Sequence, residues 1–373
     1  MRVGLVTPRY PPVVSGGGEI SVKLLADQLS NRGHDVTVFS FDGGDETSVD
    51  GVPVRRFRRP PHAVMEVGNA YAAYELWRHR DELTSLDVVH AYNVTLTPAV
   101  GAVASHLDLP SVATLNSYDL LPKSTFGVSA DVPRRLYELL AMPTTGRLLR
   151  RAACDVERFV TLSAASRDLY REHGFDSVPI EVVPNMLDPS FAVPDTVRDD
   201  GGYELLYVGS LIHEKGVEYL VRAMSELPKD VTLRIVGDGD KRERLESLVT
   251  DLGVDNRVAF AGHLPYEEVR VAYAEADCFV HPGVWPEPFG RTILEAMQAG
   301  LPVVATAVGG PAEVVPQDEL LVPPRDPDGL AAGIRTARER SDVGAENREY
   351  VTERFAPERI VGELLDVYGR AID

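Results

Sequence analysis

The chain has 373 residues, of which 44% are hydrophobic and 25% charged, fractions typical of a soluble globular protein. This length exceeds what one compact core usually sustains, so we expect two domains. The formal net charge of −19 argues against nucleic-acid binding and predicts an acidic, strongly solvated surface. With only five lysines among 38 basic residues, the composition resembles that of salt-adapted (halophile-like) proteins.

The start of the chain, "MRVGLVTPRYPP", indicates a short strand ended by prolines and not a signal peptide. No apolar run approaches the roughly 20 residues that a membrane-spanning helix needs. Cys154 and Cys278 lie far apart in apolar segments, a pattern that favours two reduced, buried thiols over a disulfide or a metal site. We therefore expect a cytoplasmic protein with no bound metal.

Residues 1–190 alternate short Val-rich runs with longer segments of helical period. The runs expected to form strands are "RVGLV", "DVTVFSF", "LDVVHA", "SVATL" and "RFVTLS". Strand and helix in alternation predict a parallel sheet with helices on both faces, which is a Rossmann-like domain.

Residues 191–202 are rich in Pro, Asp and Gly and are predicted to be a linker. The alternation resumes in residues 203–355, with strands expected at "YELLYVG", "VTLRIVG", "RVAFAG", "DCFVHP" and "LPVVAT". Residues 356–373 predict an amphipathic helix that packs back toward the N-terminal domain. The predicted fold class is α/β, with two doubly wound domains facing a cleft at the carboxyl ends of their strands, where such sheets bind ligands.

Two glutamates flank a predicted helix start in "WPEPFGRTILEAM". The surrounding prolines delay the helix to about Gly290, so Glu287 lies in the loop and Glu295 lies inside the helix. A helical path of eight residues spans about 12 Å, enough to contact both ends of an extended phosphate-bearing ligand. The amides between them, of Phe289, Gly290, Arg291 and Thr292, form an anion site. Alternatively, Glu287 and Glu295 are ordinary solvated acids of a loop and a helix face.

A second loop, "GSLIHEKG", follows the strand at "YELLYVG" and places Lys215 just before a helix. An ammonium there can meet a diphosphate. Taken alone, such a lysine is more often simply exposed to solvent.

Several motifs in the sequence are similar to those of a known protein family. "GSLIHEKG", the Glu287 and Glu295 pair, "GLPVVATAVGGPAEVV", "VPNMLDPSF" and "GGGE" resemble glycosyltransferase family 4. The resemblance covers essentially the entire chain and is more specific in its C-terminal half. It implies a GT-B fold, an N-terminal domain that binds the acceptor, a C-terminal domain that binds a nucleotide-sugar, and transfer with retention of anomeric configuration. No cofactor is implied, and the donor is a UDP-, GDP- or ADP-linked sugar.

The resemblance also implies roles for individual residues. Lys215 neutralises the donor diphosphate, Glu287 contacts the transferred sugar and Glu295 holds the ribose hydroxyls. The remaining donor-binding residues contribute backbone groups or space for the donor: Gly16, Gly17, Ser210, Gly237, Leu264, Phe289, Gly290, Arg291 and Thr292. The candidates on the acceptor side are His90, Asn116 and Tyr118.

Two positions depart from the family pattern. Many relatives have Arg at the position of Ser210, and a His-Asp pair at the positions of Asn116 and Ser117. Mechanisms that need a basic side chain at either place are therefore in doubt. His90 and His281 end strands near the expected cleft, and structural or substrate-binding roles are favoured for both over a role as catalytic base.

Arginines cluster in the N-terminal half of the chain. They occur in "RRFRRPP" at 55–61, at Arg134 and Arg135, and at Arg147, Arg150 and Arg151. Such clusters predict a peripheral contact with an anionic membrane or with a lipid-linked acceptor. The alternative is a set of solvated arginines paired with the many acids.

The predicted function is transfer of a sugar from a nucleotide-sugar to a hydroxyl acceptor, which is a glycan, a lipid-linked saccharide or a small molecule. Growing charge on the leaving diphosphate would be stabilised by Lys215 and the helix start without a metal. Two alternatives stay open: a sugar-nucleotide epimerase, and a catalytically silent subunit that binds nucleotide-sugars.

Overall fold

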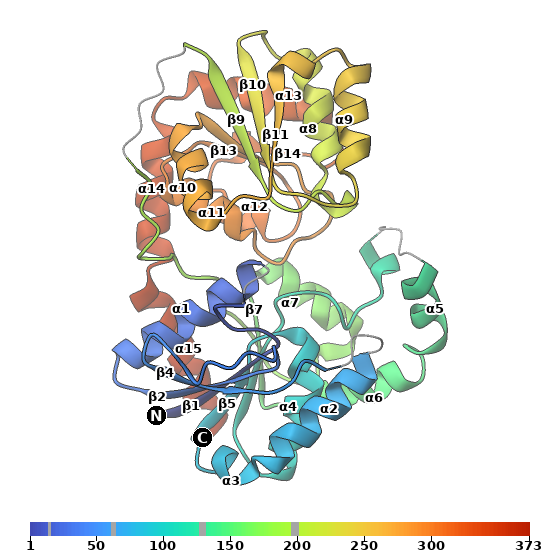
Figure 1. Ribbon diagram of the computed structural model, residues 1–373, viewed down its shortest axis with the longest axis vertical. Helices are drawn as coiled ribbons and strands as arrows, with labels where there is room; N and C mark the ends of the chain where they lie inside the picture. Colours follow the sequence, from blue (N-terminus) through green and yellow to red (C-terminus); the bar gives the residue numbers. More distant parts are fainter. Residues whose placement is uncertain (14–15, 61–64, 127–131, 195–200) are drawn as a thin grey trace. The chain divides into compact units, whose positions relative to one another are not determined.

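The structure is a computed structural model that describes residues 1–13, 16–60, 65–126, 132–194 and 201–373 (Figure 1). It divides into two compact units. Unit 1 comprises Met1–Met186 and Pro357–Asp373, and unit 2 comprises Leu187–Ala356. The segment 187–194 belongs to unit 2, so this unit starts earlier than the domain expected at residue 203. Hydrogen bonds explain the difference: the Leu187 amide donates to the Phe355 carbonyl, and Gln298 Nε2 donates to the Asp188 carbonyl.

Unit 1 contains a sheet in the order β3-β4-β2-β1-β5-β6-β7-β8, parallel except for β3. Its strands are β1 Arg2–Thr7, β2 Asp35–Ser40, β3 Ser48–Val49, β4 Val52–Arg56, β5 Val88–Ala91, β6 Ser111–Thr114, β7 Arg158–Thr161 and β8 Ile180–Val182. Its helices are α1 Gly17–Asn31, α2 Met65–Arg78, α3 Arg80–Leu83, α4 Thr97–His106, α5 Val132–Leu140, α6 Thr145–Ala153, α7 Ala164–Tyr170 and α15 Pro357–Ile372. Short helical turns, η1 Val94–Leu96, η2 Lys123–Phe126 and η3 Arg171–Phe175, complete the unit.

Helices cover both faces of the unit 1 sheet, which is why its strands are apolar on both sides. On one face, α1 and α15 pack against alternate residues of the central strands, such as Val3, Leu5 and Val88. The apolar stripe of α15, for example Val361 and Leu364, is buried in this core. The C-terminal helix therefore completes the N-terminal unit, since it covers a face of the sheet that would otherwise be exposed.

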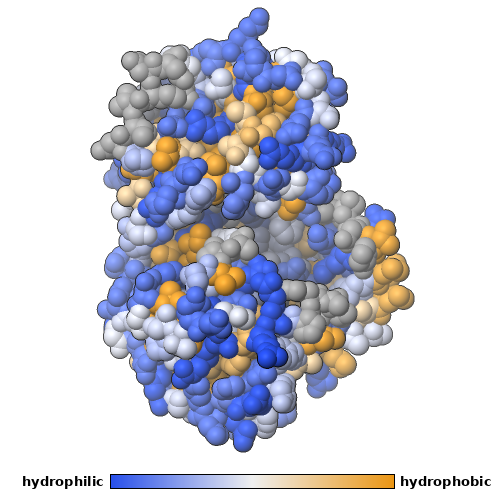
Figure 2. All heavy atoms as spheres, in the orientation of Figure 1, coloured by the Kyte–Doolittle hydropathy of each residue, from blue (hydrophilic) through white to orange (hydrophobic). Residues whose placement is uncertain are grey.

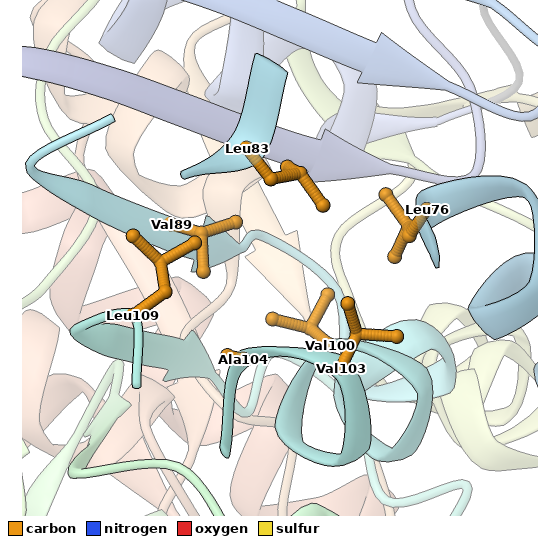
Figure 3. A pocket seen from close by; sticks show the side chains of 7 residues that line it. All are labelled: Leu76, Leu83, Val89, Val100, Val103, Ala104 and Leu109. Atoms are coloured by element: carbon orange, nitrogen blue, oxygen red, sulfur yellow. The ribbon is translucent and has the colours of Figure 1, made fainter. Parts of the chain in front are cut away.

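On the other face, α2 and α4 cover β5 and enclose a small cavity (Figure 3). Its volume is about 10 Å³, and its lining is aliphatic: Leu76, Leu83, Val89, Val100, Val103, Ala104 and Leu109. It holds at most about one water and offers that water no polar partner. The cavity is therefore a packing gap and not a ligand site.

Unit 2 contains a sheet in the order β11-β10-β9-β12-β13-β14, with every pairing parallel among the described residues. Its strands are β9 Tyr203–Val208, β10 Val231–Val236, β11 Val258–Gly262, β12 Cys278–His281, β13 Val303–Thr306 and β14 Leu321–Val322. Its helices are α8 Val217–Ala223, α9 Arg242–Asp251, α10 Tyr266–Glu275, α11 Arg291–Gln298, α12 Pro311–Val314, α13 Pro327–Glu339 and α14 Val343–Arg354. The short turns are η4 His213–Lys215, η5 Met224–Glu226, η6 Asp255–Arg257 and η7 Asp318–Leu320.

The helices of unit 2 also form two layers (Figure 1). α8, α9 and α13 share a core with Leu205, Ile235 and Val280, on one face of the sheet. Phe279, which precedes Val280 in β12, points to the opposite face and contacts Tyr273 of α10. Side chains alternate across a strand, so this pattern places helices on both faces and confirms the doubly wound topology predicted from the sequence.

The ten strands predicted from Val-rich runs are present, and the predicted C-terminal helix spans Pro357–Ile372. Four strands were missed: the β3 and β4 pair, and the edge strands β8 and β14. The thiol prediction needs one correction, because Cys278 is buried whereas Cys154 is only half-buried; both are free. Among the described residues, no helix is both long and apolar enough to cross a bilayer.

Candidate functional site

Two loops of unit 2 meet at the carboxyl ends of β9 and β12. Gly216, at the start of α8, has a φ of +64°, and an added Cβ would lie 2.0 Å from the Pro282 carbonyl oxygen. The Val284 amide donates to the Glu214 carbonyl at 3.0 Å. Only glycine allows so close an approach of the two backbones. The "GSLIHEKG" loop is therefore fixed directly against the loop that carries Glu287.

Lys215 and Glu287 form an ion pair where these loops meet. Lys215 Nζ lies 2.7 Å from Glu287 Oε2, and His281 Nε2 lies 3.0 Å from the same oxygen. Burial alone would raise the pKa of Glu287, but the charges and hydrogen bonds of Lys215 and His281 outweigh it and hold this pKa well below its usual value. Glu287 is therefore a fixed, ionised acceptor and not a solvated loop acid.

Two consecutive glycines that follow β13 contact the backbone of the Glu287 loop and support its conformation. The Gly310 amide donates to the Glu287 carbonyl at 2.7 Å. Gly309 has a φ of +66°, and an added Cβ there would lie 2.6 Å from backbone atoms of Pro286. The hydroxyl of Thr306, at the end of β13, donates to the Gly283 carbonyl at 2.5 Å. The loop conformation is thus set by a neighbouring strand and the turn that follows it.

The helix that follows Glu287 begins at Arg291, one residue after the predicted start. Gly290 is its N-cap, with a φ of +91°, and Phe289 beside it is buried. Arg291 and Thr292 occupy the first turn, where backbone amides point out of the helix end. The positive end of the helix dipole therefore lies close in sequence to the Lys215 and Glu287 pair, separated from Glu287 by three residues.

Glu295 lies inside this helix and is 7% exposed. The Tyr273 hydroxyl donates to its Oε2 at 3.1 Å, and Arg291 Nε lies 3.6 Å from its Oε1. Burial raises the pKa of Glu295, and the charge of Arg291 and the Tyr273 hydrogen bond offset this only in part. Glu287 and Glu295 therefore differ electrostatically: the first is stabilised as an anion and the second is not.

Two further loops of unit 2 carry predicted donor-binding residues. Gly237, with a φ of +130°, packs so closely on Gly209 that an added Cβ would lie 2.0 Å from its carbonyl oxygen. The Gly237 amide donates to the Gly262 carbonyl at 2.7 Å. Ser210 is exposed, and its carbonyl accepts from Tyr207. Leu264, two residues after β11, is half-buried. Close backbone contacts thus link the loops that follow β9, β10 and β11 at the carboxyl ends of these strands.

In unit 1, predicted residues lie at the ends of β1 and β6. Gly16 is the N-cap of α1, and Gly17 is its first residue. Asn116, after β6, is half-buried; its Oδ1 accepts from the Val94 amide at 3.4 Å. Tyr118 is buried and shares a hydrogen bond of 2.8 Å with Ser166. Asn116 thus keeps a partly accessible amide, whereas the Tyr118 ring is part of the core.

The position of His90 changes its interpretation. This residue is fully buried, with Nδ1 at 2.7 Å from the Tyr368 hydroxyl and Nε2 at 2.8 Å from Thr114 Oγ1. Burial lowers its pKa to about 3, so the ring is neutral. Both ring nitrogens are occupied, and none is left for an acceptor hydroxyl. His90 therefore joins the C-terminal helix to the sheet instead of binding substrate.

Comparison with known proteins agrees with this architecture. A family model described as Glycosyltransferase Family 4 matches residues 15–191, and one described as glycosyl transferases group 1 matches residues 191–354. An uncharacterized glycosyltransferase of Methanocaldococcus jannaschii is 31% identical over 100% of this chain and 99% of its own length. The chain belongs to glycosyltransferase family 4.

Other relatives and solved structures extend the comparison. A glycogen synthase of Mycobacterium tuberculosis is 31% identical to this glycosyltransferase over 90% of the chain and 86% of its own length. Sucrose-phosphate synthase from Thermosynechococcus elongatus has a TM-score of 0.79 at 23% identity, covering 99% of this chain and 98% of its own. Anabaena HepE, solved with UDP and glucose, has a TM-score of 0.78 at 22% identity, with 99% of both chains covered. These neighbours establish the GT-B fold, and the epimerase alternative is not favoured.

Sequence reasoning missed part of what supports the site in this glycosyltransferase. The sequence favours a structural or substrate-binding role for His281 but does not indicate that it shares the Glu287 oxygen with Lys215. Gly309 and Gly310 had been quoted within a motif without a role. The signal was present in the consecutive glycines after an apolar strand, which indicate a close backbone approach. Which backbone approaches them is a matter of tertiary structure.

The arginine clusters divide into arginines with an ion-pair or hydrogen-bond partner and exposed arginines without an ion pair. Arg56 is buried in an ion pair with Asp42, and Arg55 pairs with Glu82. Arg134 pairs with Glu138, and Arg150 donates to the His173 carbonyl. Within the described residues of these clusters, the exposed arginines without an ion pair are Arg58, Arg59, Arg135, Arg147 and Arg151. The predicted basic surface is therefore smaller than the sequence clusters suggested.

Proposed function

We propose that this glycosyltransferase transfers a sugar from a nucleotide-sugar donor to a hydroxyl acceptor, with retention of configuration and without a metal. The observation that carries the proposal is the largely buried cluster of Lys215, His281 and Glu287, in which Glu287 lies shortly before the start of α11 in the chain. A cation together with the amides of a helix start suits a diphosphate leaving group, and a fixed carboxylate suits sugar hydroxyls.

Each charged group in the cluster has a defined role in the proposal. Lys215 neutralises the charge that grows on the diphosphate as the bond to the sugar breaks, and the amides of Arg291 and Thr292 bind the phosphate oxygens. Glu287 accepts hydrogen bonds from the transferred sugar and so orients its anomeric carbon. When the donor binds, Lys215 exchanges its Glu287 partner in part for phosphate, which keeps both charges compensated.

The nucleoside portion would bind the neighbouring loops of unit 2. Glu295 accepts hydrogen bonds from the ribose hydroxyls in place of that from Tyr273, and backbone groups near Gly237 and Leu264 contact the base. Ser210, where many relatives have Arg, leaves Lys215 as the principal side-chain cation of the proposal.

Retention follows from a transfer on one face of the sugar. The leaving phosphate oxygen accepts the proton of the acceptor hydroxyl while that hydroxyl oxygen bonds to the anomeric carbon, so no enzyme base is required. Asn116 remains the acceptor-side candidate, because its amide is partly accessible, whereas His90 and Tyr118 are buried with their polar atoms bonded. A covalent mechanism would need a carboxylate beneath the anomeric carbon.

The test is turnover of a panel of UDP-, GDP- and ADP-sugars with a set of hydroxyl acceptors. Lys215→Ala and Glu287→Ala should each lower turnover at least about a hundredfold, the usual cost of removing one transition-state stabiliser. Lys229→Ala is the matched control, since Lys229 is exposed in the same unit and should leave turnover unchanged. Near-wild-type rates in both site variants would contradict the proposal.

The same assay separates the finer parts of the proposal. NMR of the product should show the anomeric configuration of the donor, and a chelator should leave the rate unchanged. An inverted product would contradict the same-face transfer, and a rate lost on chelation would contradict the metal-free mechanism. Donor binding without turnover of any acceptor would favour a silent nucleotide-sugar-binding subunit.

A further inference from the structure

Helix α5 of unit 1 has its amphipathic faces reversed. Residues at i, i+4, i+7 and i+8 form its apolar stripe, and all four are exposed: Val132 69%, Leu136 53%, Leu139 72% and Leu140 70%. A surface helix normally turns such a stripe toward the core, as α15 does with Val361 and Leu364. The apolar stripe of α5 instead faces solvent.

The polar stripe of α5 holds the helix to the rest of unit 1. Arg134 donates to the carbonyls of Asp119 and Leu121 at 3.1 and 2.9 Å. Glu138 accepts from the Lys123 amide at 2.8 Å, and the Tyr137 hydroxyl donates to a Glu66 carboxylate at 3.2 Å. These bonds fix the orientation of the helix, so its outward apolar face is a feature of the fold.

The next helix, α6, extends this surface. Leu148 is 69% exposed, and Arg147 and Arg151 beside it are exposed as well. Near its C-terminal end α6 packs tightly on α4, where a Cβ added to Gly101 would lie 2.1 Å from the Ala152 carbonyl oxygen. We call Val132, Leu136, Leu139, Leu140 and Leu148 the α5–α6 patch. Figure 2 shows hydrophobic side chains gathered at the edge of unit 1 where α5 lies.

The charge around the patch is opposite to that of the chain. Residues 132–153 contain five arginines and one glutamate, within a chain of net charge −19. Arg135 flanks the apolar stripe on α5, and Arg147 and Arg151 flank Leu148 on α6. Leucines on one face bordered by arginines are typical of helices that lie in a membrane interface. With nine residues each, α5 and α6 are far too short to cross a bilayer.

We propose that the α5–α6 patch docks this enzyme on a membrane surface that contains anionic lipid. The leucines enter the boundary between headgroups and acyl chains, and the three exposed arginines contact lipid phosphates. A second copy of the chain suits the patch less well, because a two-fold contact would bring the same arginines against one another. The patch shares no residue with the proposed sugar-transfer site, and the proposal does not depend on the proposed function.

The test is co-sedimentation of the purified full chain with vesicles of phosphatidylcholine, with and without phosphatidylglycerol. The wild type should bind the vesicles that contain phosphatidylglycerol and bind pure phosphatidylcholine more weakly. Leu139→Glu combined with Leu140→Glu should lower binding at least about tenfold, since two apolar anchors become charged. Arg147→Glu combined with Arg151→Glu should lower binding and weaken its dependence on salt.

Val271→Glu is the matched control, because Val271 is an exposed apolar residue of α10 in unit 2, 37% accessible, and should leave binding unchanged. Thermal unfolding of each variant shows whether it is folded. Absence of wild-type binding, or equal binding by the Leu139 and Leu140 variant, would overturn the proposal. So would a concentration-dependent dimer that this variant abolishes, since a second copy would then occupy the patch.

Discussion

Two buried histidines, one in each unit, lie near the ends of equivalent central strands and have different hydrogen-bond partners. His90 of β5 is 0% exposed, and both of its ring nitrogens bond to other elements of the unit 1 core. His281 of β12 is 2% exposed; its Nε2 bonds to Glu287, and its Nδ1 has no hydrogen-bond partner in the described residues. The comparison teaches that residue type and strand position do not distinguish a core histidine from a site histidine. The hydrogen-bond partners around the imidazole ring distinguish the two.

The largest expected effect tests the structural side of this comparison. The pKa of His90 is lowered to about 3 from 6.5, so the unfolded chain binds a proton in this range and the folded chain does not. Stability from the neutral ring is thus fully present above pH 6.5 and is lost as pH falls toward 3. The loss should reach about 4–5 kcal/mol.

Denaturant unfolding as a function of pH measures this loss. His90→Gln should have a shallower decline than the wild type over the same window. His106→Gln is the control, because His106 is exposed, and its decline should equal that of the wild type. Equal slopes for the wild type and His90→Gln would show that His90 does not couple protonation to folding.

A second prediction concerns the glycines behind the Glu287 loop. Gly309→Ala should lower the free energy of unfolding by about 2–4 kcal/mol, because the residue has a positive φ and its new Cβ overlaps the backbone of Pro286. Chemical denaturation of the variant and the wild type measures this difference in the free energy of unfolding. Gly362→Ala is the matched control: nothing lies within 4 Å of a Cβ at this position of α15. That control should be neutral or stabilised by up to about 1 kcal/mol. A Gly309→Ala enzyme of unchanged stability would show that the loop adapts freely.

The smallest expected effect tests the role of His281, the histidine that contacts Glu287. His281→Ala should lower turnover about tenfold, equivalent to about 1.4 kcal/mol, because Glu287 loses one of its two partners and is held less precisely. His281→Asn should recover part of the rate, since an amide can also donate to the carboxylate. His90→Gln, assayed where it is folded, should keep the wild-type rate. If His281→Ala were as fast as the wild type, Lys215 alone would position Glu287.

The sequence predicted most of the scaffold and part of the site. Strands buried on both faces are Val-rich runs that can be recognised without tertiary information, and all ten predicted strands formed. The prolines around Glu287 correctly delayed the helix, which begins at Arg291. Strands β3, β4, β8 and β14 were missed. Of these, β3, β8 and β14 have only two or three residues, which carry too little periodicity to be recognised.

Predictions that depended on the three-dimensional surroundings of a side chain were less accurate. Of the two roles favoured for His90, substrate binding and a structural role, its burial in the core supports the structural one. Arg56, one of the arginines predicted either to face a membrane or to pair with acids, forms a buried ion pair with Asp42. The reversed faces of α5 could not be recognised, because its pattern of leucines and arginines is the same whichever stripe packs inward.

The sequence by itself determined the two α/β units, the helix delayed by prolines and the motifs of glycosyltransferase family 4. These depend on hydrophobic periodicity and on the backbone limits of Pro and Gly, which act over a few residues. Only the tertiary structure decided that Lys215 and His281 share an oxygen of Glu287, that Gly309 supports their loop, and that the leucines of α5 face outward. Burial, pKa and close backbone contact arise between residues distant in the chain, so they depend on how the elements pack.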